Sequence, residues 1–304
     1  MSGFPARATL REVGLRDGIQ SLGAFVSTEH KIELLEALAA TGLRRLEATS
    51  FVHPKHVPQM ADAEEVMARV QRAPGVRYEA LVPNVKGAER AIAAGVDALV
   101  FVTAASDAFN HKNVQMSVDD SLGVAEQVCQ LGHAAGVPVL AGIATSFGCP
   151  YSGDVPLEQL VSVVSRLVEL GFAEIELADT TGMANPLQVE RSVAGVLDHF
   201  GDRASFSLHF HNTRGMGLAN AVAGLRSGIT TFDASLGGIG GCPFAPRATG
   251  NICTEDTVHL FHELGIATGI DLDHLIEVAH RAQDILGFEL PGQVMKAGPV
   301  AHQR

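Results

Sequence analysis

The segment ELGFAEIELADTTG, residues 169–182, contains one copy of a pattern that recurs along the chain. A helical stretch ends at Gly171, an apolar run rich in strand-forming residues follows at once, and polar residues close the unit. Glycine is favoured directly after a helix because it adopts the left-handed backbone conformation without steric penalty. We therefore interpret the segment as a junction from a helix into a buried β-strand.

Six further glycines stand at similar junctions, and all seven are expected to be left-handed residues that end helices: Gly42, Gly75, Gly95, Gly136, Gly171, Gly201 and Gly228. With the opening run ATLREVGLRD, residues 8–17, they predict eight strands. Helical segments lie between the strands, the first with Thr28 as its expected N-cap. Strands that alternate with helices form parallel βαβ units. Eight such units predict an α/β fold of the (β/α)8 TIM-barrel type.

A doubly wound open sheet is the competing architecture. It would carry a glycine-rich phosphate loop after its first strand, and LRDGIQS, residues 15–21, does not have the G-x-G-x-x-G spacing. We expect one catalytic domain over residues 1–304, with the barrel at about 8–250 and extra C-terminal helices at about 251–290. No change in composition indicates a second domain.

Bulk properties exclude several classes of protein. A net charge of −12 gives no basic footprint for nucleic acid. The first residues contain no apolar targeting segment, and no apolar run approaches the ~20 residues that span a bilayer. The four cysteines lack the paired spacing of zinc sites and suggest no oxidising compartment: Cys129, Cys149, Cys242 and Cys253. We expect a cytoplasmic protein without nucleic-acid or membrane partners.

Polar residues collect at the expected carboxyl ends of the strands, where TIM barrels carry their catalytic groups. They are Glu12, Arg16 and Asp17 of strand 1, Glu47, Thr49 and Ser50 of strand 2, Asp179, Thr180 and Thr181 of strand 6, His209 and His211 of strand 7, and Cys242 and Asn251 after strand 8. Scattered surface residues would not fall on one rim so consistently. This convergence predicts an active site at that end of the barrel.

The stretch SFSLHFHNTRG, residues 205–215, suggests a metal site. His209 and His211 are two residues apart on a strand, so both imidazoles point to the same side and can bind one ion. An isolated His-x-His on a half-solvated strand needs no function, but here Asp17 and Asn251 are expected on the same rim. One carboxylate oxygen, two nitrogens and one amide oxygen suit Mg2+ or Mn2+, with catalytic Zn2+ as the alternative.

Four motifs resemble the hydroxymethylglutaryl-CoA lyases, which belong to a metal-dependent TIM-barrel superfamily of lyases and synthases. The motifs are EVGLRDGIQ (12–20), LEATSFVHPKHVPQM (46–60), HFHNTRGMGLAN (209–220) and GGIGGCPFAPRATGN (237–251), and the resemblance covers residues 8 to 290. It implies cleavage of 3-hydroxy-3-methylglutaryl-CoA to acetyl-CoA and acetoacetate, as in leucine degradation and ketone-body formation. It also implies an acyl-CoA substrate, with a homodimer as a candidate assembly.

Carried over by position, the resemblance assigns roles to individual residues. It implies that the metal ligands are Asp17, His209, His211 and Asn251, and that Cys242, Arg16, Asp17, Glu47 and His209 are catalytic. Whether His209 also takes part in proton transfer is left open, since a metal-bound nitrogen cannot act as a base. Gln20, Ser50, Asp179 and Thr180 are expected to bind the substrate. Cys149 resembles a family position, and its part in the site is left open.

Several pocket positions depart from the family pattern. Leu140 and Gly142 stand where the lyases usually carry arginine and tyrosine, Glu176 replaces a small residue, and Ser21, Leu22 and Gly23 replace polar positions. We expect Gly142 to enlarge the pocket, which favours a longer or more apolar acyl group unless a neighbour such as Glu176 refills the space. The main alternative is therefore a lyase of the same family that acts on a different 3-hydroxyacyl-CoA.

Two other classes remain. A condensing synthase or pyruvate-type aldolase of the same superfamily is disfavoured by the Cys242 loop and by the lack of a regulatory domain after residue 290. A non-catalytic acyl-CoA-binding or metal-binding protein would not need the full set of predicted catalytic residues and ligands.

Overall fold

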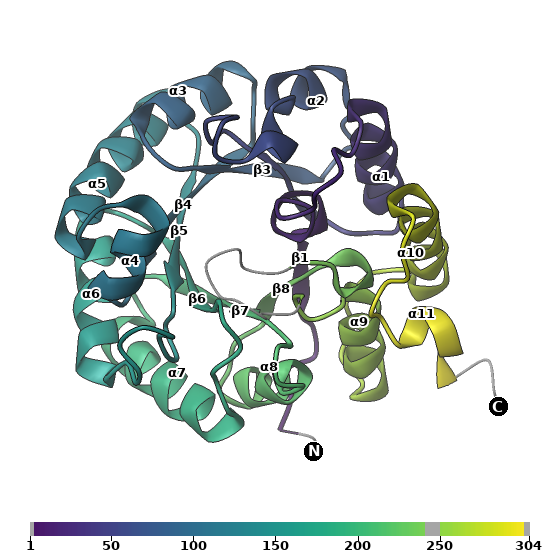
Figure 1. The fold of residues 1–304 in the computed structure, drawn as a ribbon. Helices are drawn as coiled ribbons and strands as arrows, with labels where there is room; N and C mark the ends of the chain where they lie inside the picture. Colours follow the sequence, from purple (N-terminus) through teal and green to yellow (C-terminus); the bar gives the residue numbers. More distant parts are fainter. Residues whose placement is uncertain (1–2, 241–249, 301–304) are drawn as a thin grey trace.

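The computed structural model describes residues 3–240 and 250–300, which form a closed barrel of parallel strands surrounded by helices (Figure 1). The strands pair in chain order around the barrel, and β1 closes on β8. Their bounds are β1 Thr9–Glu12, β2 Arg45–Ser50, β3 Arg77–Val82, β4 Ala98–Ala104, β5 Val139–Ala144, β6 Glu174–Asp179, β7 Ser205–Phe210 and β8 Thr231–Ala234. The predicted TIM barrel and each of its expected strands are confirmed.

The helices form the outer ring, and the last of them lie beside β1 and β8 (Figure 1). Their bounds are α1 Thr28–Ala40, α2 Ala63–Arg69, α3 Val85–Ala93, α4 Asp107–Val114, α5 Val118–Ala135, α6 Leu157–Glu169, α7 Pro186–Phe200, α8 Gly217–Arg226, α9 Thr254–Glu263, α10 Leu272–Leu286 and α11 Val294–Ala297. Three short turns are η1 Gly14–Gly18, η2 Pro58–Met60 and η3 Leu236–Gly238. Within the described residues, no helix is long and apolar enough to cross a bilayer.

The junction glycines behave as predicted with one exception. Gly171 has φ +95° and Gly136 has φ +68°, and the same positive range holds at the other junctions except Gly201. Gly201 has φ −57°, so the prediction of a left-handed residue there is wrong. Its N–H continues the helix by donating to the Leu197 carbonyl, and a β-carbon at Gly201 would lie 2.8 Å from that oxygen. Glycine is needed there for space.

The start of α1 also differs from the prediction. Ser27, and not Thr28, is the N-cap, because its side chain accepts a hydrogen bond from the His30 N–H. Thr28 is the first helical residue, and its hydroxyl donates to Asp62 at 2.8 Å.

The first strand ends sooner than the apolar run suggested. β1 stops at Glu12, and Arg16 and Asp17 lie on the π-helical turn η1. A β-carbon at Gly14 would lie 2.6 Å from Glu12 Oε1, and one at Gly18 would lie 2.6 Å from Ile239 Cγ1. These glycines let the turn fold tightly against the mouth of the barrel, so Arg16 and Asp17 are buried there.

The two faces of the strands differ in chemistry. Side chains such as Leu99 and Ile175 pack outward into the apolar core beneath the helices. Inside the barrel there is a network of charged side chains: Arg11 of β1 contacts Glu79 of β3, Glu176 of β6 and Asp233 of β8. Contacts among strands on opposite sides of a barrel form only in its lumen. An ionic network therefore spans the lumen, beside apolar side chains such as Val100 and Leu140.

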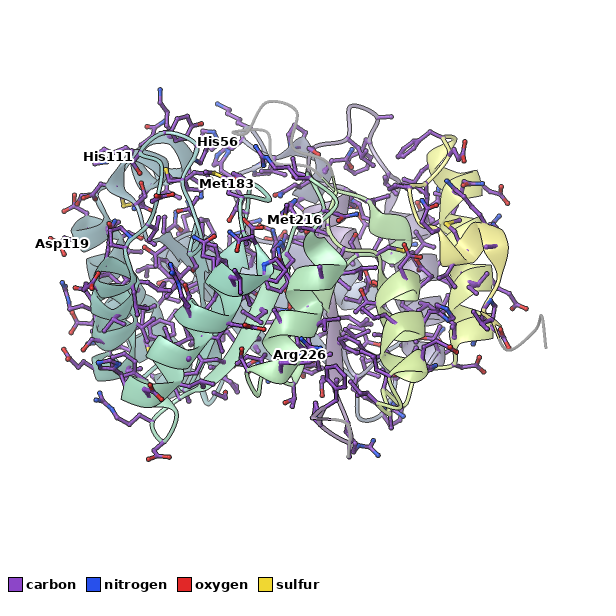
Figure 2. All side chains as sticks on the ribbon, turned by 90° about the horizontal axis from the view of Figure 1, so that it is seen from below. His56, His111, Asp119, Met183, Met216 and Arg226 are labelled. Carbon is purple, nitrogen blue, oxygen red and sulfur yellow. The ribbon has the colours of Figure 1, made fainter. Side chains whose placement is uncertain are left out.

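The loops that follow the strands gather at one end of the molecule. In Figure 2, His56, Met183 and Met216, which follow β2, β6 and β7, lie toward the upper end, and Arg226 at the end of α8 lies toward the lower end. The predicted site residues Asp17, His209 and Asn251 are buried at the upper mouth.

Candidate active site

Three of the predicted metal ligands lie together. Asp17 from η1, His209 from β7 and His211 directly after β7 present ligand atoms within 4.8 Å of one another. His209 Nε2 is 3.9 Å and His211 Nε2 is 3.8 Å from Asp17 Oδ2. Since a divalent ion binds such atoms at about 2.0–2.2 Å, donors up to about 4 Å apart can share it. All three residues are buried, and their arrangement fits one ion.

The fourth predicted ligand, Asn251, completes the cluster. Its Nδ2 donates to Asp17 Oδ2 at 2.8 Å, and its backbone bridges to His211 beside the end of β7. Its Oδ1 is buried and accepts no hydrogen bond within the described part of the chain. A buried polar oxygen without a partner is costly, so a cation is the natural partner for this atom. The donor set therefore fits a divalent metal.

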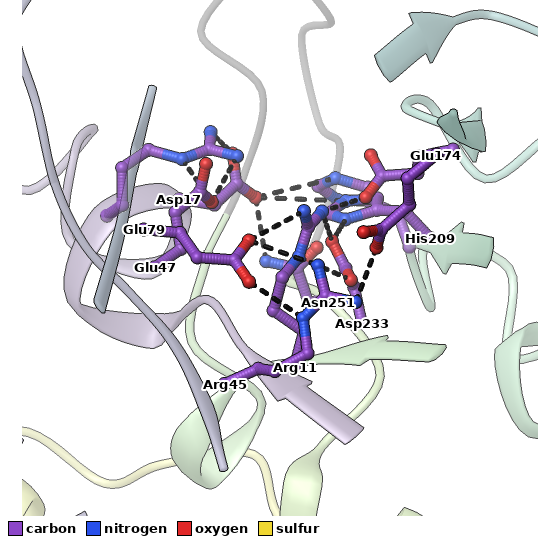
Figure 3. Close-up of polar contacts among 12 residues, drawn as sticks. Arg11, Asp17, Arg45, Glu47, Glu79, Glu174, His209, Asp233 and Asn251 are labelled. Atoms are coloured by element: carbon purple, nitrogen blue, oxygen red, sulfur yellow. Dashed lines mark hydrogen bonds and ion pairs between the residues drawn. The ribbon is translucent and has the colours of Figure 1, made fainter. Parts of the chain in front are cut away.

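The two carboxylate oxygens of Asp17 have different partners (Figure 3). Oδ1 accepts from Arg16 Nη1 at 2.6 Å and from Gln20 Nε2 at 2.7 Å, while Oδ2 faces the two imidazoles and Asn251. Burial opposes ionisation, but the charge of Arg16, the two histidines and the Asn251 bond lower the pKa of Asp17 to about 2. Asp17 is thus a carboxylate at neutral pH.

Arg16 is fixed from two sides. Its Nε and Nη2 each lie 2.7 Å from Glu47 Oε2, and its Nη1 binds Asp17. Burial would lower the pKa of Arg16, but the charges of Glu47 and Asp17 outweigh it and raise that pKa above the ordinary value. The guanidinium is therefore a permanent positive charge held beside the metal ligands, as the predicted roles of Arg16 and Glu47 require.

His209 links the cluster to the lumen beneath it. Its Nδ1 lies 3.1 Å from Asp233 Oδ2, on the side of the ring away from Asp17. Burial would lower the pKa of His209, but the Asp233 hydrogen bond and the charges of Glu176, Asp233 and Asp17 raise it to about 9. A cation must displace this proton to bind His209.

The carboxyl group of Glu176 lies close to Asp233 and His209. Desolvation and the charge of Asp233 raise the pKa of Glu176 to about 8. These three residues could hold an ion by spacing alone, but the Arg11 guanidinium already binds Glu176 and Asp233 (Figure 3). The second cluster is therefore an ion pair with an arginine and not a second metal site.

Sequence reasoning missed this lumenal network. The signal was a charge at every second position of three strands: Arg45 and Glu47 in β2, Arg77 and Glu79 in β3, and Glu174 and Glu176 in β6. Alternation places such residues on one face of a strand, and only barrel closure makes that face the lumen.

The expected substrate-binding residues have partners of their own. Asp179 accepts from the N–H groups of Met183 and Ala184, and burial raises its pKa to about 6. Thr180 Oγ1 accepts from the Thr145 N–H, and Ser50 Oγ accepts from the Val52 N–H. These contacts shape the loops of the rim, and direct binding of substrate by these side chains stays a prediction. Cys242 lies outside the described residues.

The expected enlargement of the pocket at Gly142 is not found. Gly142 lies in the middle of β5 and pairs with Val102 and Glu176. A β-carbon there would lie 3.4 Å from both Glu176 Oε1 and Val102 Cγ2, which is ordinary packing distance. The glutamate on the neighbouring strand fills the space that the glycine leaves. Gly142 therefore gives no support for a longer acyl chain in the substrate.

Comparison with known proteins gives matches over nearly the whole chain. The model of the HMGL-like family matches residues 7–281. The chain is 42% identical to hydroxymethylglutaryl-CoA lyase YngG of Bacillus subtilis, over 95% of this chain and 97% of that protein. It is 43% identical to (R)-citramalyl-CoA lyase of Chloroflexus aurantiacus, over 97% and 96% of the two chains.

A solved structure is equally similar. An HMG-CoA lyase from Acinetobacter baumannii, in complex with coenzyme A and 3-methylmalate, superposes with a TM-score of 0.94 at 42% identity and covers 98% of this chain and 97% of its own.

Proposed function

The chain belongs to the HMGL-like family, and from this premise we propose that it is a metal-dependent carbon–carbon lyase that cleaves 3-hydroxy-3-methylglutaryl-CoA to acetyl-CoA and acetoacetate. The observation that carries the proposal is the buried cluster of Asp17, His209, His211 and Asn251 next to the fixed guanidinium of Arg16. Relatives that match nearly end to end bear the name of this activity.

The reaction is a retro-Claisen cleavage. The tertiary alcohol loses its proton, the bond between C2 and C3 breaks, and the electron pair moves onto the acetyl thioester as an enolate that then takes up a proton. A divalent ion, when bound, supplies Lewis-acid stabilisation of the substrate's oxygens. Asp17, His209, His211 and Asn251 would hold this ion at the mouth of the barrel.

Arg16 stabilises the negative charge that develops on the thioester oxygen. A permanently charged guanidinium is suited to this task because it offers several donors and needs no reorganisation when it is held in place. Glu47 holds Arg16 through Nε and Nη2, and Asp17 holds it through Nη1. Glu47 is thus a positioning residue for the charge that Arg16 supplies.

The proton that converts the enolate to acetyl-CoA is assigned to Cys242. The support is the resemblance of the loop GGIGGCPFAPRATGN to the family's cysteine loop, and a thiol with a pKa near ~8.5 is acidic enough to donate to an enolate carbon. Asn251, at the end of the same loop, belongs to the predicted ligand set. The proposed proton donor and a predicted metal ligand therefore belong to the same segment of the sequence.

The metal requirement has a direct test. Chelation should abolish cleavage, and Mg2+ or Mn2+ should restore it, since both prefer the mixed oxygen and nitrogen donors present here. The assay measures acetoacetate formed from hydroxymethylglutaryl-CoA. Full activity of the chelated enzyme would contradict metal dependence, and recovery with Zn2+ alone would replace the proposed ion.

A second substrate is tested alongside the first because the citramalyl-CoA lyase matches as closely as the hydroxymethylglutaryl-CoA lyases. Cleavage of the corresponding bond in citramalyl-CoA gives acetyl-CoA and pyruvate. With Glu176 filling the space at Gly142, we expect the higher kcat/KM for hydroxymethylglutaryl-CoA. A clear preference for citramalyl-CoA would keep the reaction and change the acyl group. A homodimer, a cytoplasmic location and the metabolic roles implied by the resemblance stay predictions.

A further inference from the structure

Asp233 of β8 binds a metal-site histidine on one side and an arginine on the other. Its Oδ2 accepts from His209 Nδ1 at 3.1 Å and from Arg11 Nη2 at 2.5 Å, and its Oδ1 accepts from Arg11 Nε at 2.9 Å. Asp233 and Arg11 are each 1% exposed. Two bonds to the planar guanidinium set both the position and the plane of the carboxylate.

A carboxylate held in this way determines which nitrogen of His209 is free. An ionised carboxylate only accepts hydrogen bonds, so the proton that faces it must be on Nδ1. Once an ion displaces the second proton of the ring, Nε2 is the atom with a lone pair, and it lies 3.9 Å from Asp17 Oδ2 on the opposite side of the ring. A half-turn of the ring about Cβ–Cγ would put Cδ2 in the place of Nδ1 and Cε1 in the place of Nε2, so it would lose both the bond to Asp233 and the nitrogen that faces Asp17.

We propose that Asp233, anchored by Arg11, is a positioning residue of the metal site that fixes the orientation and tautomer of His209 so that Nε2 faces the ion. The inference rests on the proposed function, which identifies the cluster as a metal site. It adds that a residue inside the lumen holds one of the ligands in place. Asp233 touches neither the ion nor the substrate, so its effect appears as metal affinity. The loss of an outer partner of this kind lowers metal affinity about 10- to 100-fold.

The test variant is Asp233→Asn, which keeps the shape of the side chain. An asparagine can accept from His209 Nδ1 with its oxygen, but its NH2 then faces Arg11, where donor meets donor. If the amide group of the asparagine flips, its NH2 faces His209. The first orientation loses the bond from Arg11 Nε, and the second loses the bonds from His209 Nδ1 and Arg11 Nη2, so either the anchor of the side chain or its hold on the imidazole is weakened.

The matched control is Glu79→Gln. Glu79 also pairs with Arg11, at 3.4 Å, and with Arg45, at 2.7 Å, and it belongs to the same buried network. It reaches Arg11 from β3, whereas the carboxylate that accepts from His209 belongs to β8. Its replacement removes the same charge without touching the bond that the proposal depends on. Glu174→Gln, at the more exposed end of the network, is a milder second control.

The measurement is the dissociation constant for Mn2+, from the electron paramagnetic resonance of the free ion, without substrate. We expect Asp233→Asn to raise it about 10- to 100-fold and Glu79→Gln to change it less than threefold. An unchanged constant in Asp233→Asn, or equal losses in both variants, would overturn the proposal. Since no substrate is present, a selective loss supports the role of Asp233 even if hydroxymethylglutaryl-CoA proves not to be cleaved.

A measurement on the wild-type protein decides the matter if Asp233→Asn does not fold. Long-range 1H–15N correlation of the Mg2+-saturated protein reports which nitrogen of each histidine carries the proton, and His209→Gln assigns the signal. We expect the proton of His209 on Nδ1. A proton on Nε2 would refute the positioning role.

Discussion

At the scale of single residues, Asp17 Oδ2 is the atom on which the metal site converges. The two imidazoles and the Asn251 amide approach it from β7 and from the chain after β8, while Arg16 and Gln20 occupy the other oxygen. This division predicts different outcomes for substitutions on the two sides of one carboxylate. Residues on the Oδ2 side should affect metal affinity, and Arg16 should affect turnover.

Asn251→Ala tests the Oδ2 side. It removes the buried Oδ1, which has no hydrogen-bond partner in the described chain, together with the Nδ2 bonds to Asp17 and to the Ile239 carbonyl. We expect the Mn2+ dissociation constant to rise at least about 10-fold, as for other partners of a metal site. The melting temperature of the metal-free protein should fall only modestly, because the loss of the two Nδ2 bonds is partly offset by the removal of an unsatisfied buried atom. An unchanged dissociation constant would remove Asn251 from the ligand set.

The pH dependence of metal binding follows from His209. Its pKa is raised to about 9 in the metal-free protein, so at neutral pH the ring carries a proton that the ion must displace. Mn2+ affinity should therefore increase as pH rises from 6 toward 9 and level off above it. Isothermal titration in buffers of different ionisation enthalpy should detect a released proton at pH 7. Affinity that is flat over this range would contradict the assignment of His209 as a ligand.

Cys242→Ser tests the proposed proton donor. A serine hydroxyl is a far weaker acid than a thiol, so kcat should fall by about 10²- to 10⁴-fold, the usual contribution of a general acid. Mn2+ affinity should stay at the wild-type value because the thiol is not among the ligands. Cys129→Ser is the control, since the Cys129 thiol donates to the Leu170 carbonyl beneath α5 and a hydroxyl can do the same. Equal kcat in both variants would exclude Cys242 from the mechanism.

At the scale of elements, two buried glutamates support the turn after β8. Glu12 accepts from the Leu236 N–H and the Thr254 hydroxyl, and Glu255 accepts from the Gly237 N–H and the Cys253 thiol. They fix η3, after which the chain runs on to Cys242 and returns at Asn251. Desolvation raises the pKa of Glu12 to about 7 and that of Glu255 to about 8.

These shifts predict how stability depends on pH. Between the ordinary glutamate pKa and about 8, the folded protein binds more protons than the unfolded chain, so the free energy of unfolding falls as pH rises. Glu255→Gln removes one such group and keeps an acceptor for the Gly237 N–H. The decrease in melting temperature between pH 5 and pH 8 should therefore be smaller in this variant. A decrease as steep as that of the wild-type protein would contradict the assignment.

The elements also show what the sequence can and cannot predict. The eight strands follow from glycine junctions and apolar runs, because both signals are local. The π-helical turn at Gly14–Gly18 was missed because its shape depends on contacts with Leu236 and Ile239, which lie far away in the sequence, after β8. The metal ligands were predictable as a set on one rim. The bond from His209 to Asp233 was not, because it joins β7 to β8 inside the barrel.

At the scale of the whole molecule, the lumenal network makes stability depend on charge pairing. Arg11 contacts Glu79, Glu176 and Asp233 at once, so Arg11→Met leaves three buried carboxyl groups, Asp233 foremost, without this partner. The loss of one member of a buried ion pair costs about 3–5 kcal/mol. Urea unfolding should show a loss of this size, and added salt should barely reduce it, because buried pairs are poorly screened.

The control for this prediction is an arginine pair on the surface. Arg281 binds Glu33 at 2.5 Å with side chains 53% and 41% exposed, and Arg281→Met should destabilise the protein far less than Arg11→Met, because solvent screens an exposed pair. Comparable losses of unfolding free energy in the two variants would show that Arg11 in the lumen stabilises the protein no more than an arginine in a surface pair.

The same network determines how molecules move through the protein. Arg45, Glu79 and Glu174 link β2, β3 and β6 across the lumen, so in the described structure side chains span the barrel and leave no open tunnel along this network. Cleavage turns one molecule into two behind a single opening. Both fragments are therefore expected to leave by the route that the thioester used to enter. The rim loops that line this exit are therefore where turnover can be limited without any change to the chemistry.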